Sequence, residues 1–131
     1  MLQQRKINPW QWQDALSFSQ AIEASGNNKV LYCSGQTSVD AQGRPLHVGN
    51  MQLQINQAFD NLETVLVSAG YSLDNVVRLN YFTTDMDAFN GAYDAVRSRL
   101  GHCQPAGTLL EVKRLAISGL LIEIEATAVI P

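Results

Sequence analysis

Two glutamates near the end of the chain are the residues best suited to chemistry. In residues 122–128, IEIEATA, apolar and polar side chains alternate with period two, the pattern of a strand with one buried face. Glu123 and Glu125 share the polar face, roughly 6.6 Å apart along the strand, which is too far for them to share one proton. One interpretation is a strand half exposed to water. The other is a carboxylate in a subunit-interface cleft, with a pKa raised by desolvation so that it passes protons to a substrate.

The stretch QPAGTLLEVK, residues 104–113, is a second place where a ligand could bind. Thr108 to Val112 have the composition of a buried strand, and the entrance to such a strand often holds a residue that grips a substrate. Gly107 stands at this entrance and has no side chain. The stretch is therefore either the ordinary start of a strand or a binding site that lacks the side chain expected to hold the ligand.

Residue types that bind metals or phosphates do not form recognisable motifs. Cys33 and Cys103 do not form a CxxC pair, and His102, next to Cys103, has no matching ligand pair in the sequence. Gly35 and Gly43 are too isolated to indicate a phosphate loop or a dinucleotide fingerprint. We therefore expect neither a metal nor a cofactor.

The composition is that of a globular protein. At 131 residues the chain is long enough for one domain, residues 1–131, whose core needs no disulfide or metal. The apolar share is 46% and the charged share 16%, and no stretch approaches the ~18 apolar residues of a membrane span. The polar N-terminus lacks the apolar run of a signal peptide. These features predict a cytoplasmic protein.

The charge argues against nucleic acid as a partner. The formal net charge is −3, the sequence pI is near 5.2, and the lysines and arginines are scattered. A nucleic-acid-binding protein is expected to carry a basic patch or stripe. Nucleic-acid binding is therefore unlikely.

Helical periodicity marks two segments. From Met51 to Ala69 the apolar residues fall on one face, with Asn50 as a plausible N-cap and Gly70 as the stop. The second predicted helix runs from Asp85 to Leu100, and the spacing of Thr84 and Asp87 resembles a capping box. Its apolar stripe is predicted to lie in the core (Phe89, Ala92, Tyr93, Val96 and Leu100).

Strand patterns surround these helices. Val30–Cys33 and Asn75–Thr83 are rich in β-branched and aromatic residues. Thr108–Arg114 and Leu120–Ile130 flank a Ser118-Gly119 turn and together predict a hairpin. Weaker strands are expected near Leu16–Ile22 and Gln4–Ile7.

This order of elements predicts an α+β domain of two layers, with two helices on one face of a mixed six-stranded sheet. The other face of the sheet would have no cover within the chain. An uncovered face calls for a partner, and self-association is the simplest solution.

Across residues 16–130 the chain resembles the reactive intermediate deaminase family, also called Rid or YjgF and formerly endoribonuclease L-PSP. The order and spacing of several short segments carry this resemblance, rather than any single motif. These segments are residues 19–22 (SQAI), 34–36 (SGQ), 61–62 (NL), 69–70 (AG), Asn90 with Tyr93, 105–106 (PA) and 122–126 (IEIEA).

The resemblance implies a chorismate-mutase-like fold and a homotrimer with small-molecule sites in the clefts between subunits. It also implies hydrolysis of enamines and imines, such as 2-aminoacrylate, to a keto acid and ammonia without a cofactor. Ser34, Asn90 and Glu123 match the pattern of the family's site, with Glu123 in the catalytic role. The loop before Asn90 is about three residues shorter than the family pattern.

Other positions depart from that pattern. Active members carry an arginine after Pro-Ala that pairs bidentately with the substrate carboxylate, and this chain has Gly107 there, followed by Thr108. The usual site tyrosine is Phe18. The cysteine whose backbone carbonyl is thought to bind the substrate nitrogen is Leu109. Removing two charge-assisted hydrogen bonds, at about 1.5–3 kcal/mol each, would weaken binding of a 2-imino acid a hundredfold or more.

Three functional hypotheses follow. The first is a divergent family member whose cleft takes a ligand without a carboxylate at the Gly107 position, either as an enzyme or as a binder. The second is the usual imino-acid deaminase, with Arg78, Arg97, Arg99 or a neighbouring subunit supplying the cation. The third is a binding or chaperone-like module, or the ribonuclease of the older label. Trp10 and Trp12 are expected to be packing anchors, although one of them could reach a neighbouring cleft.

Overall fold

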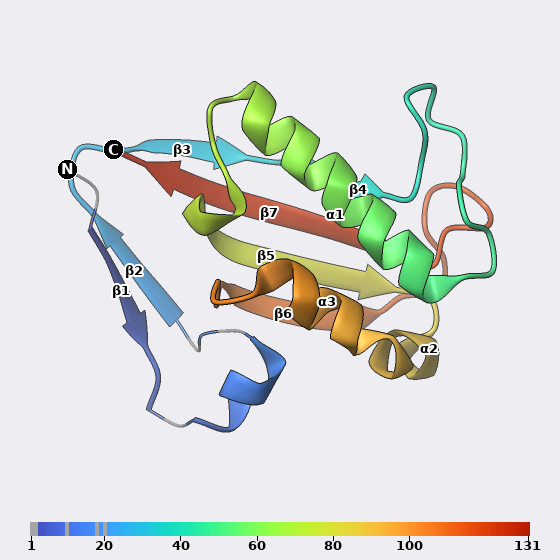
Figure 1. Cartoon of the computed structure of the whole chain (residues 1–131), viewed down its shortest axis with the longest axis horizontal. Helices are drawn as coiled ribbons and strands as arrows, with labels where there is room; N and C mark the ends of the chain where they lie inside the picture. Colours follow the sequence, from blue (N-terminus) through green and yellow to red (C-terminus); the bar gives the residue numbers. More distant parts are fainter. Residues whose placement is uncertain (1–2, 10, 18, 20) are drawn as a thin grey trace.

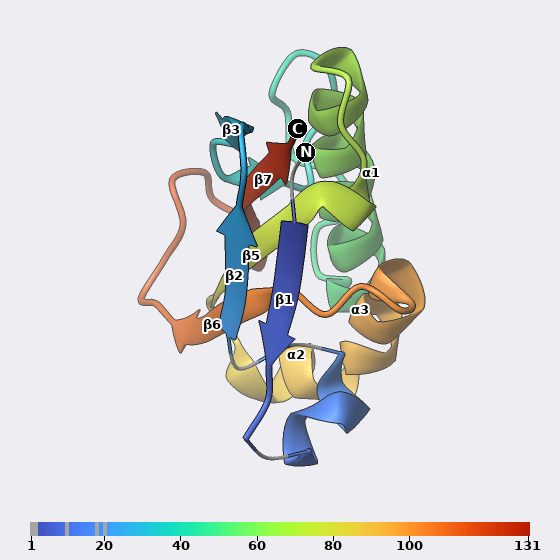
Figure 2. The same cartoon turned by 90° about the vertical axis from the view of Figure 1, so that its left-hand side faces the viewer.

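The architecture is a mixed β-sheet with helices packed on one of its faces (Figure 1, Figure 2). The structure is a computed structural model that describes residues 3–9, 11–17, 19 and 21–131. The main sheet has five strands in the order β3-β7-β5-β6, with β4 paired to β7. Its strands are β3 (Lys29–Tyr32), β4 (Gln36–Thr37), β5 (Val76–Thr83), β6 (Ala106–Glu111) and β7 (Ile122–Ile130).

The predicted hairpin between the last two strands is wrong. Strand β6 pairs in parallel with β5, while β7 pairs antiparallel with the other edge of β5. Strand β5 therefore lies between β6 and β7, and the turn at Ser118-Gly119 belongs to a connection that crosses from one side of β5 to the other.

The first strands of the chain do not join the main sheet. Strands β1 (Gln3–Ile7) and β2 (Ala21–Ser25) pair with each other, from Gln3 opposite Ser25 to Ile7 opposite Ala21. Between them lies the short 3₁₀ helix η1 (Trp12–Leu16). Among the described residues the prediction of one six-stranded sheet is therefore wrong, since the strands divide into a five-stranded sheet and a two-stranded ribbon.

Helix α1 (Met51–Ser68) ends within one residue of its predicted bounds. The Asn50 side chain caps its first turn by accepting a hydrogen bond from the Leu53 amide at 3.0 Å. Gly70, with φ of 83°, lets the chain turn away in a left-handed conformation after the last turn. Local signals at both ends thus define this helix.

The second predicted helix is two helices, α2 (Met86–Gly91) and α3 (Tyr93–Leu100). Gly91 is a poor helix former, and Ala92 after it leaves helical geometry with φ of −106° and ψ of 11°. The predicted capping box is also wrong by one residue. Asp85, rather than Thr84, caps α2 by accepting a hydrogen bond from the Ala88 amide at 3.0 Å.

The core lies between the helices and one face of the sheet. The alternation predicted for β7 is confirmed, since its four alternate apolar residues from Ile122 to Ala128 are buried and Glu123 and Glu125 are only half-buried on the other face. The largest fully buried side chains come from both layers: Phe59, Phe89, Ile55, Leu62, Leu66, Leu79, Ile122 and Ile124.

In the part of the chain that the structure describes, no helix covers the opposite face of the sheet (Figure 2). Tyr32 on β3 is 79% exposed there, and Leu110 on β6 is also exposed. No helix among the described residues is long and apolar enough to span a membrane.

Candidate functional site

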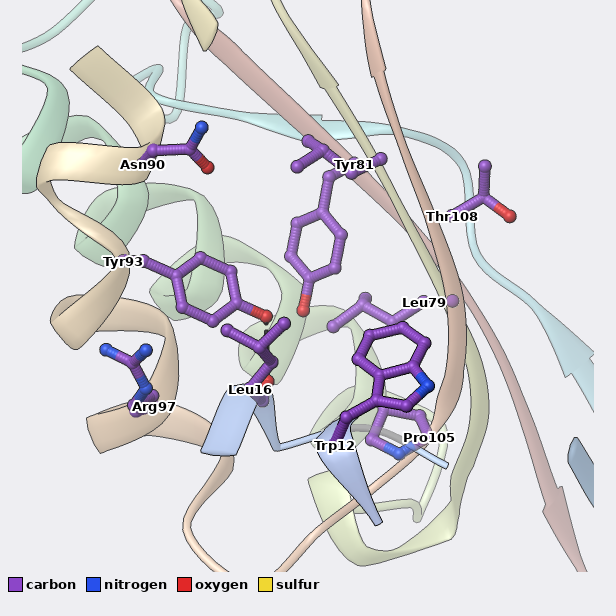
Figure 3. Close-up of a pocket in the computed structure, with 11 residues that line it drawn as sticks. Trp12, Leu16, Leu79, Tyr81, Asn90, Tyr93, Arg97, Pro105 and Thr108 are labelled. Atoms are coloured by element: carbon purple, nitrogen blue, oxygen red, sulfur yellow. Dashed lines mark hydrogen bonds between the residues drawn. The ribbon is translucent and has the colours of Figure 1, made fainter. Parts of the chain in front are cut away.

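A cavity of about 450 Å³ lies on the helix side of the sheet, within the ~300–1,000 Å³ range of small-molecule sites. Strands β5 and β6 form one wall, α2 and α3 another, and η1 lies across it (Figure 3). The lining is mostly apolar and aromatic. It consists of Trp12, Leu16, Leu79, Tyr81, Asn90, Tyr93, Arg97, Pro105, Gly107, Thr108 and Leu109.

Helix α3 holds η1 in place over the cavity. The Tyr93 hydroxyl donates a hydrogen bond to the Leu16 carbonyl at 2.8 Å. Arg97 Nε donates to the Ala15 carbonyl at 2.6 Å. These two bonds place Leu16 and Trp12 on the cavity wall, and Trp12 keeps 62% of its surface exposed. Trp12 is therefore a cavity residue of this chain rather than only a packing anchor.

Tyr81 projects from β5 into the cavity, and its ring is held by aromatic contacts. The rings of Tyr81 and Phe89 lie 5.7 Å apart, and those of Phe89 and Tyr93 lie 5.6 Å apart at 72°, an edge-on arrangement. Burial, and to a smaller extent the neighbouring Tyr93, raise the pKa of Tyr81 well above its ordinary value. Burial also raises the pKa of Tyr93, which Arg97 partly offsets.

Gly107 lies in the cavity wall on β6, opposite Leu79 of β5. A Cβ atom on this residue would lie 2.5 Å from the carbonyl oxygen of Leu79, a separation that side chains do not tolerate. Backbone movement would be needed to relieve this contact, since Leu79 is paired with Gly107 in the sheet. The glycine therefore has a structural reason of its own, apart from any lost ligand contact.

Four of the predicted ligand-binding residues meet at this cavity: Asn90, Gly107, Thr108 and Leu109. Thr108 contributes through its backbone, because its side chain points away from the cavity (Figure 3) and accepts a hydrogen bond from Arg78 Nη2 at 3.2 Å. Phe18, the fifth predicted residue of this group, lies outside the described residues, as does Trp10.

Ser34 and Glu123 lie elsewhere in the chain. Glu123 is on the open face of the sheet, and its carboxylate lies over Gly35, where a Cβ atom would come within 1.9 Å of Glu123 Oε1. Ser34, just before Gly35, is exposed. Within one chain the predicted site is thus divided between the cavity and this second group of residues, which we call the carboxylate corner (Ser34, Gly35 and Glu123).

The carboxylate corner has the electrostatics of a proton-transfer group. Partial burial raises the pKa of Glu123 above its ordinary 4.5, and the nearby charge of Glu125 raises it further. Glu125 itself accepts a hydrogen bond from Asn80 Nδ2 at 3.2 Å. The two glutamates therefore differ in their surroundings, as their spacing along the strand suggested.

None of the three candidate arginines takes the place of a side chain at Gly107. Arg78 lies on the open face, bonded to Thr108. Arg99 pairs with Asp60 at 2.8 Å and Glu63 at 2.5 Å, away from the cavity. Arg97 does line the cavity, but its guanidinium is bonded to Ala15, paired with Asp94 and placed 5.1 Å from the Tyr93 ring centroid.

One group among the described residues has the ligand types of a metal site. It consists of Asp74, just before β5, and His102 and Cys103, just before β6. Asp74 Oδ1 contacts His102 Nε2 at 3.2 Å and Cys103 Sγ at 3.0 Å, so the three side chains already satisfy one another. Burial and Asp74 raise the pKa of the Cys103 thiol to about 12, which favours the thiol over a metal-binding thiolate. The expectation of no metal stays a prediction.

The sequence did not single out Leu16 and Tyr81 as site residues. It named Arg97 only as one of several candidate cations, and it placed Tyr93 in the core. Strand alternation puts Tyr81 on the helix side with Leu79, and this alone indicates core packing. The one sequence signal that could have indicated a site residue is the hydroxyl group of Tyr81 among apolar neighbours, because a buried hydroxyl needs a hydrogen-bond partner.

Solved structures share the fold of this chain. The crystal structure of YyfB, a protein of unknown function of the Rid family from Yersinia pestis, matches with a TM-score of 0.85 and 32% identity, covering 95% of this chain and 97% of that one. A member of the YjgF/YER057c/UK114 family from Mycobacterium tuberculosis shares the fold, with a TM-score of 0.68. The fold is thus an α+β fold of the YjgF or chorismate-mutase-like type.

The sequence gives the family as well. The family model for endoribonuclease L-PSP matches residues 12–130. The mitochondrial protein mmf1 of Schizosaccharomyces pombe is 38% identical over 124 residues, which are 93% of this chain and 74% of that protein. A 2-iminobutanoate/2-iminopropanoate deaminase of Mus musculus is 30% identical over 112 residues, 86% of this chain and 80% of the mouse protein. This chain belongs to the endoribonuclease L-PSP family, also called Rid or YjgF.

Proposed function

We propose that this Rid-family protein uses its cavity for a small metabolite without a carboxylate at the Gly107 position, and that it is not a standard 2-aminoacrylate deaminase. The single observation that carries this proposal is the cavity wall at Gly107. Its backbone contact with Leu79 leaves no room for a side chain, and the one arginine lining the cavity is already paired. A buried carboxylate without a cationic partner is costly, so a neutral ligand suits this lining better.

A homotrimer would complete the site. Glu123 and Ser34 do not line the cavity of their own chain, and the resemblance to the family implies clefts between subunits. The open face of the sheet, with exposed Tyr32 and Leu110, is the surface that neighbouring copies would cover. In this assembly the carboxylate corner of one copy faces the cavity of the next.

Glu123 is the candidate catalytic residue in such a cleft. Hydrolysis of an imine adds water across the C=N bond, and a carboxylate with a raised pKa accepts a proton from water and returns it to the leaving nitrogen. No cofactor takes part in this scheme. In this cleft Ser34, Asn90, Thr108, Leu109 and Phe18 would contact the ligand.

Two alternatives remain open. The first is hydrolysis of 2-imino acids to 2-keto acids and ammonia, which the name of the mouse relative favours. The second is a non-catalytic small-molecule-binding or chaperone-like module. The ribonuclease activity in the family's name is disfavoured by the net charge of −3 and the lack of a basic stripe in the sequence. We place the protein in the cytoplasm as a proposal.

A ligand screen and an activity assay test the proposal together. Thermal-shift and crystal-soak screens should find neutral compounds that stabilise the protein, and ammonia release from 2-iminopropanoate should be weak. If small 2-keto acids alone stabilise it, the proposed ligand class is wrong. If it releases ammonia from 2-iminopropanoate as fast as an arginine-containing family member does, the deaminase alternative replaces the proposal.

A further inference from the structure

The geometry points to the hydroxyl of Tyr81 as the group that selects the ligand of this cavity. We propose that it donates a hydrogen bond to an uncharged ligand with an apolar body and one acceptor, of the carbonyl or imine class. This inference deepens the proposed function and rests on it, because it assigns the ligand class of the same cavity.

Tyr81 faces the cavity with a hydroxyl that has no hydrogen-bond partner among the described residues (Figure 3). Its side chain is only 7% exposed, yet neither a hydrogen-bond donor nor an acceptor from the described chain meets its oxygen. The Tyr93 hydroxyl, by contrast, is bonded to the Leu16 carbonyl. Figure 3 shows the Tyr81 hydroxyl pointing into the cavity, between Tyr93 and Leu79. A hydroxyl at the cavity surface without a protein partner is available to a ligand.

The hydroxyl is fixed in position before a ligand arrives. Phe89 packs against the Tyr81 ring on the helix side, and Tyr81 is paired with Leu109 in the sheet. Burial holds the pKa of Tyr81 well above its ordinary range, so the group is a neutral donor at physiological pH. A fixed donor loses little conformational entropy when it binds an acceptor.

The space in front of the Tyr81 hydroxyl depends on the absence of a side chain at Gly107. A Cβ atom on residue 107 would lie 3.9 Å from the Tyr81 ring, so any longer side chain there would extend along the ring into the space of the ligand. The absence of a side chain at Gly107 leaves this space open in front of the hydroxyl. The cavity thus presents a neutral donor from β5 rather than a cation from β6.

The remaining polar groups favour an uncharged ligand. Arg97 lies beside Tyr93 and is already bonded to Asp94 and to the Ala15 carbonyl, so these partners hold its guanidinium before a ligand binds. Among the described residues, no carboxylate lines the cavity either. Apolar walls with a fixed donor at Tyr81 and the neutral amide of Asn90 match an uncharged ligand with an apolar body and a polar acceptor.

The test uses two probes that differ in the acceptor, acetophenone and ethylbenzene, and two variants that each remove the hydroxyl of a largely buried tyrosine. Tyr81→Phe removes the proposed donor and keeps the ring. Tyr71→Phe is the matched control, since Tyr71 is 9% exposed but lies outside the cavity. Dissociation constants are measured by titrating ¹⁵N-labelled protein and following amide chemical shifts of the cavity residues.

We expect Tyr81→Phe to weaken acetophenone binding roughly three- to tenfold, the range for one neutral hydrogen bond. Ethylbenzene binding should be unchanged, and Tyr71→Phe should alter neither probe. The ratio of the two probes' affinities is compared between the wild type and Tyr81→Phe. This comparison cancels the different hydrophobicity of the probes, as in a double-mutant cycle. The unfolding temperature of Tyr81→Phe without ligand should be no lower than that of the wild type, because the hydroxyl has no partner in the folded chain.

Each other result has a definite meaning. If both probes bind in the cavity and Tyr81→Phe weakens them equally or not at all, the role of Tyr81 is refuted while the cavity function stands. If neither probe shifts the cavity amides of the wild type, the proposed apolar-ligand site fails, and this inference fails with it. A lower unfolding temperature for Tyr81→Phe would show that the hydroxyl serves folding instead.

Discussion

Two glycines, Gly107 in the cavity wall and Gly35 in the carboxylate corner, are both crowded, but by different kinds of atom. A side chain on Gly107 would meet the backbone carbonyl of Leu79 at 2.5 Å, whereas one on Gly35 would meet the carboxylate of Glu123 at 1.9 Å. Backbone in a paired strand moves only at high cost, whereas the end of a glutamate rotates easily. The cavity wall is therefore fixed by the fold, and the corner is set by a side chain that can adjust.

The two regions also differ in chemistry. The cavity is mostly apolar, with hydroxyl groups and an ion-paired arginine, and is suited to binding. The corner has a carboxylate of raised pKa, and is suited to proton transfer. A ligand needs both regions only if chemistry takes place, so variants in the two regions should separate binding from catalysis.

The largest effect is expected for Glu123→Gln. If the cleft hydrolyses a neutral imine, this change should lower kcat about a hundredfold or more, the usual contribution of a positioned acid–base group. Ligand affinity at the cavity should change much less. The measurement is ammonia release alongside a binding titration, with Glu125→Gln as the neighbouring control. An equal loss in both variants would mean that the strand's charge matters, rather than the proton transfer of Glu123.

The next largest effect is on stability. Gly107→Ala should destabilise the protein by about 1–3 kcal/mol, as overpacking does, because its Cβ atom would press on the Leu79 carbonyl. Gly91→Ala is the matched control, since its Cβ atom meets nothing within 4 Å in α2, and it should stabilise by about 0.4–1 kcal/mol. Urea unfolding measures both. Equal stability of the two variants would remove the structural reason for Gly107.

Gly35→Ala should change stability by less than ~0.5 kcal/mol, because Glu123 can rotate away from the new methyl group. The rotation should nevertheless move the carboxylate out of the corner and shift its pKa toward the ordinary value as it becomes more exposed. Carboxyl-carbon NMR titration of Glu123 reports this shift. A destabilisation as large as that of Gly107→Ala would show that the corner is as rigid as the cavity wall.

The smallest effect is the pH dependence of stability. The pKa of Glu123 is higher in the folded protein than its ordinary 4.5, so its contribution to stability is fully present below about pH 4.5 and is lost as the pH rises through the folded-state pKa. In Glu123→Gln this loss should disappear. In Glu125→Gln it should shrink, since one source of the raised pKa is removed. Free energies of unfolding between pH 4 and pH 7 measure the difference, and identical curves for the wild type and Glu123→Gln would contradict it.

Elements with local signals were predictable from the sequence. Helix α1 has a continuous apolar stripe, an Asn50 cap and a Gly70 stop, and its bounds were correct to one residue. The alternation in β7 predicted which face carries Glu123. The placement of Asn90, Gly107, Thr108 and Leu109 around one cavity agrees with the resemblance to the family.

Features that depend on contacts between distant segments were not predictable. The chain order suggested a hairpin of the last two strands, but β5 lies between them, and no local pattern encodes that insertion. Gly91 was not recognised as the break between α2 and α3. The reason for Gly107 is the approach of the Leu79 backbone, which only the folded sheet reveals. Tyr81 was missed because its ring packs as a core residue does, and only the unpaired hydroxyl distinguishes it.

The central claim is that the cavity selects against a carboxylate. Its most direct test compares the affinity of the wild-type protein for acetophenone and for phenylglyoxylate, which differ by the replacement of a methyl group with a carboxylate, using isothermal titration calorimetry. We predict that acetophenone binds at least as tightly as phenylglyoxylate, because no free cation lines the described cavity. Binding of phenylglyoxylate tenfold or more tighter than acetophenone would contradict the account and restore the imino-acid deaminase.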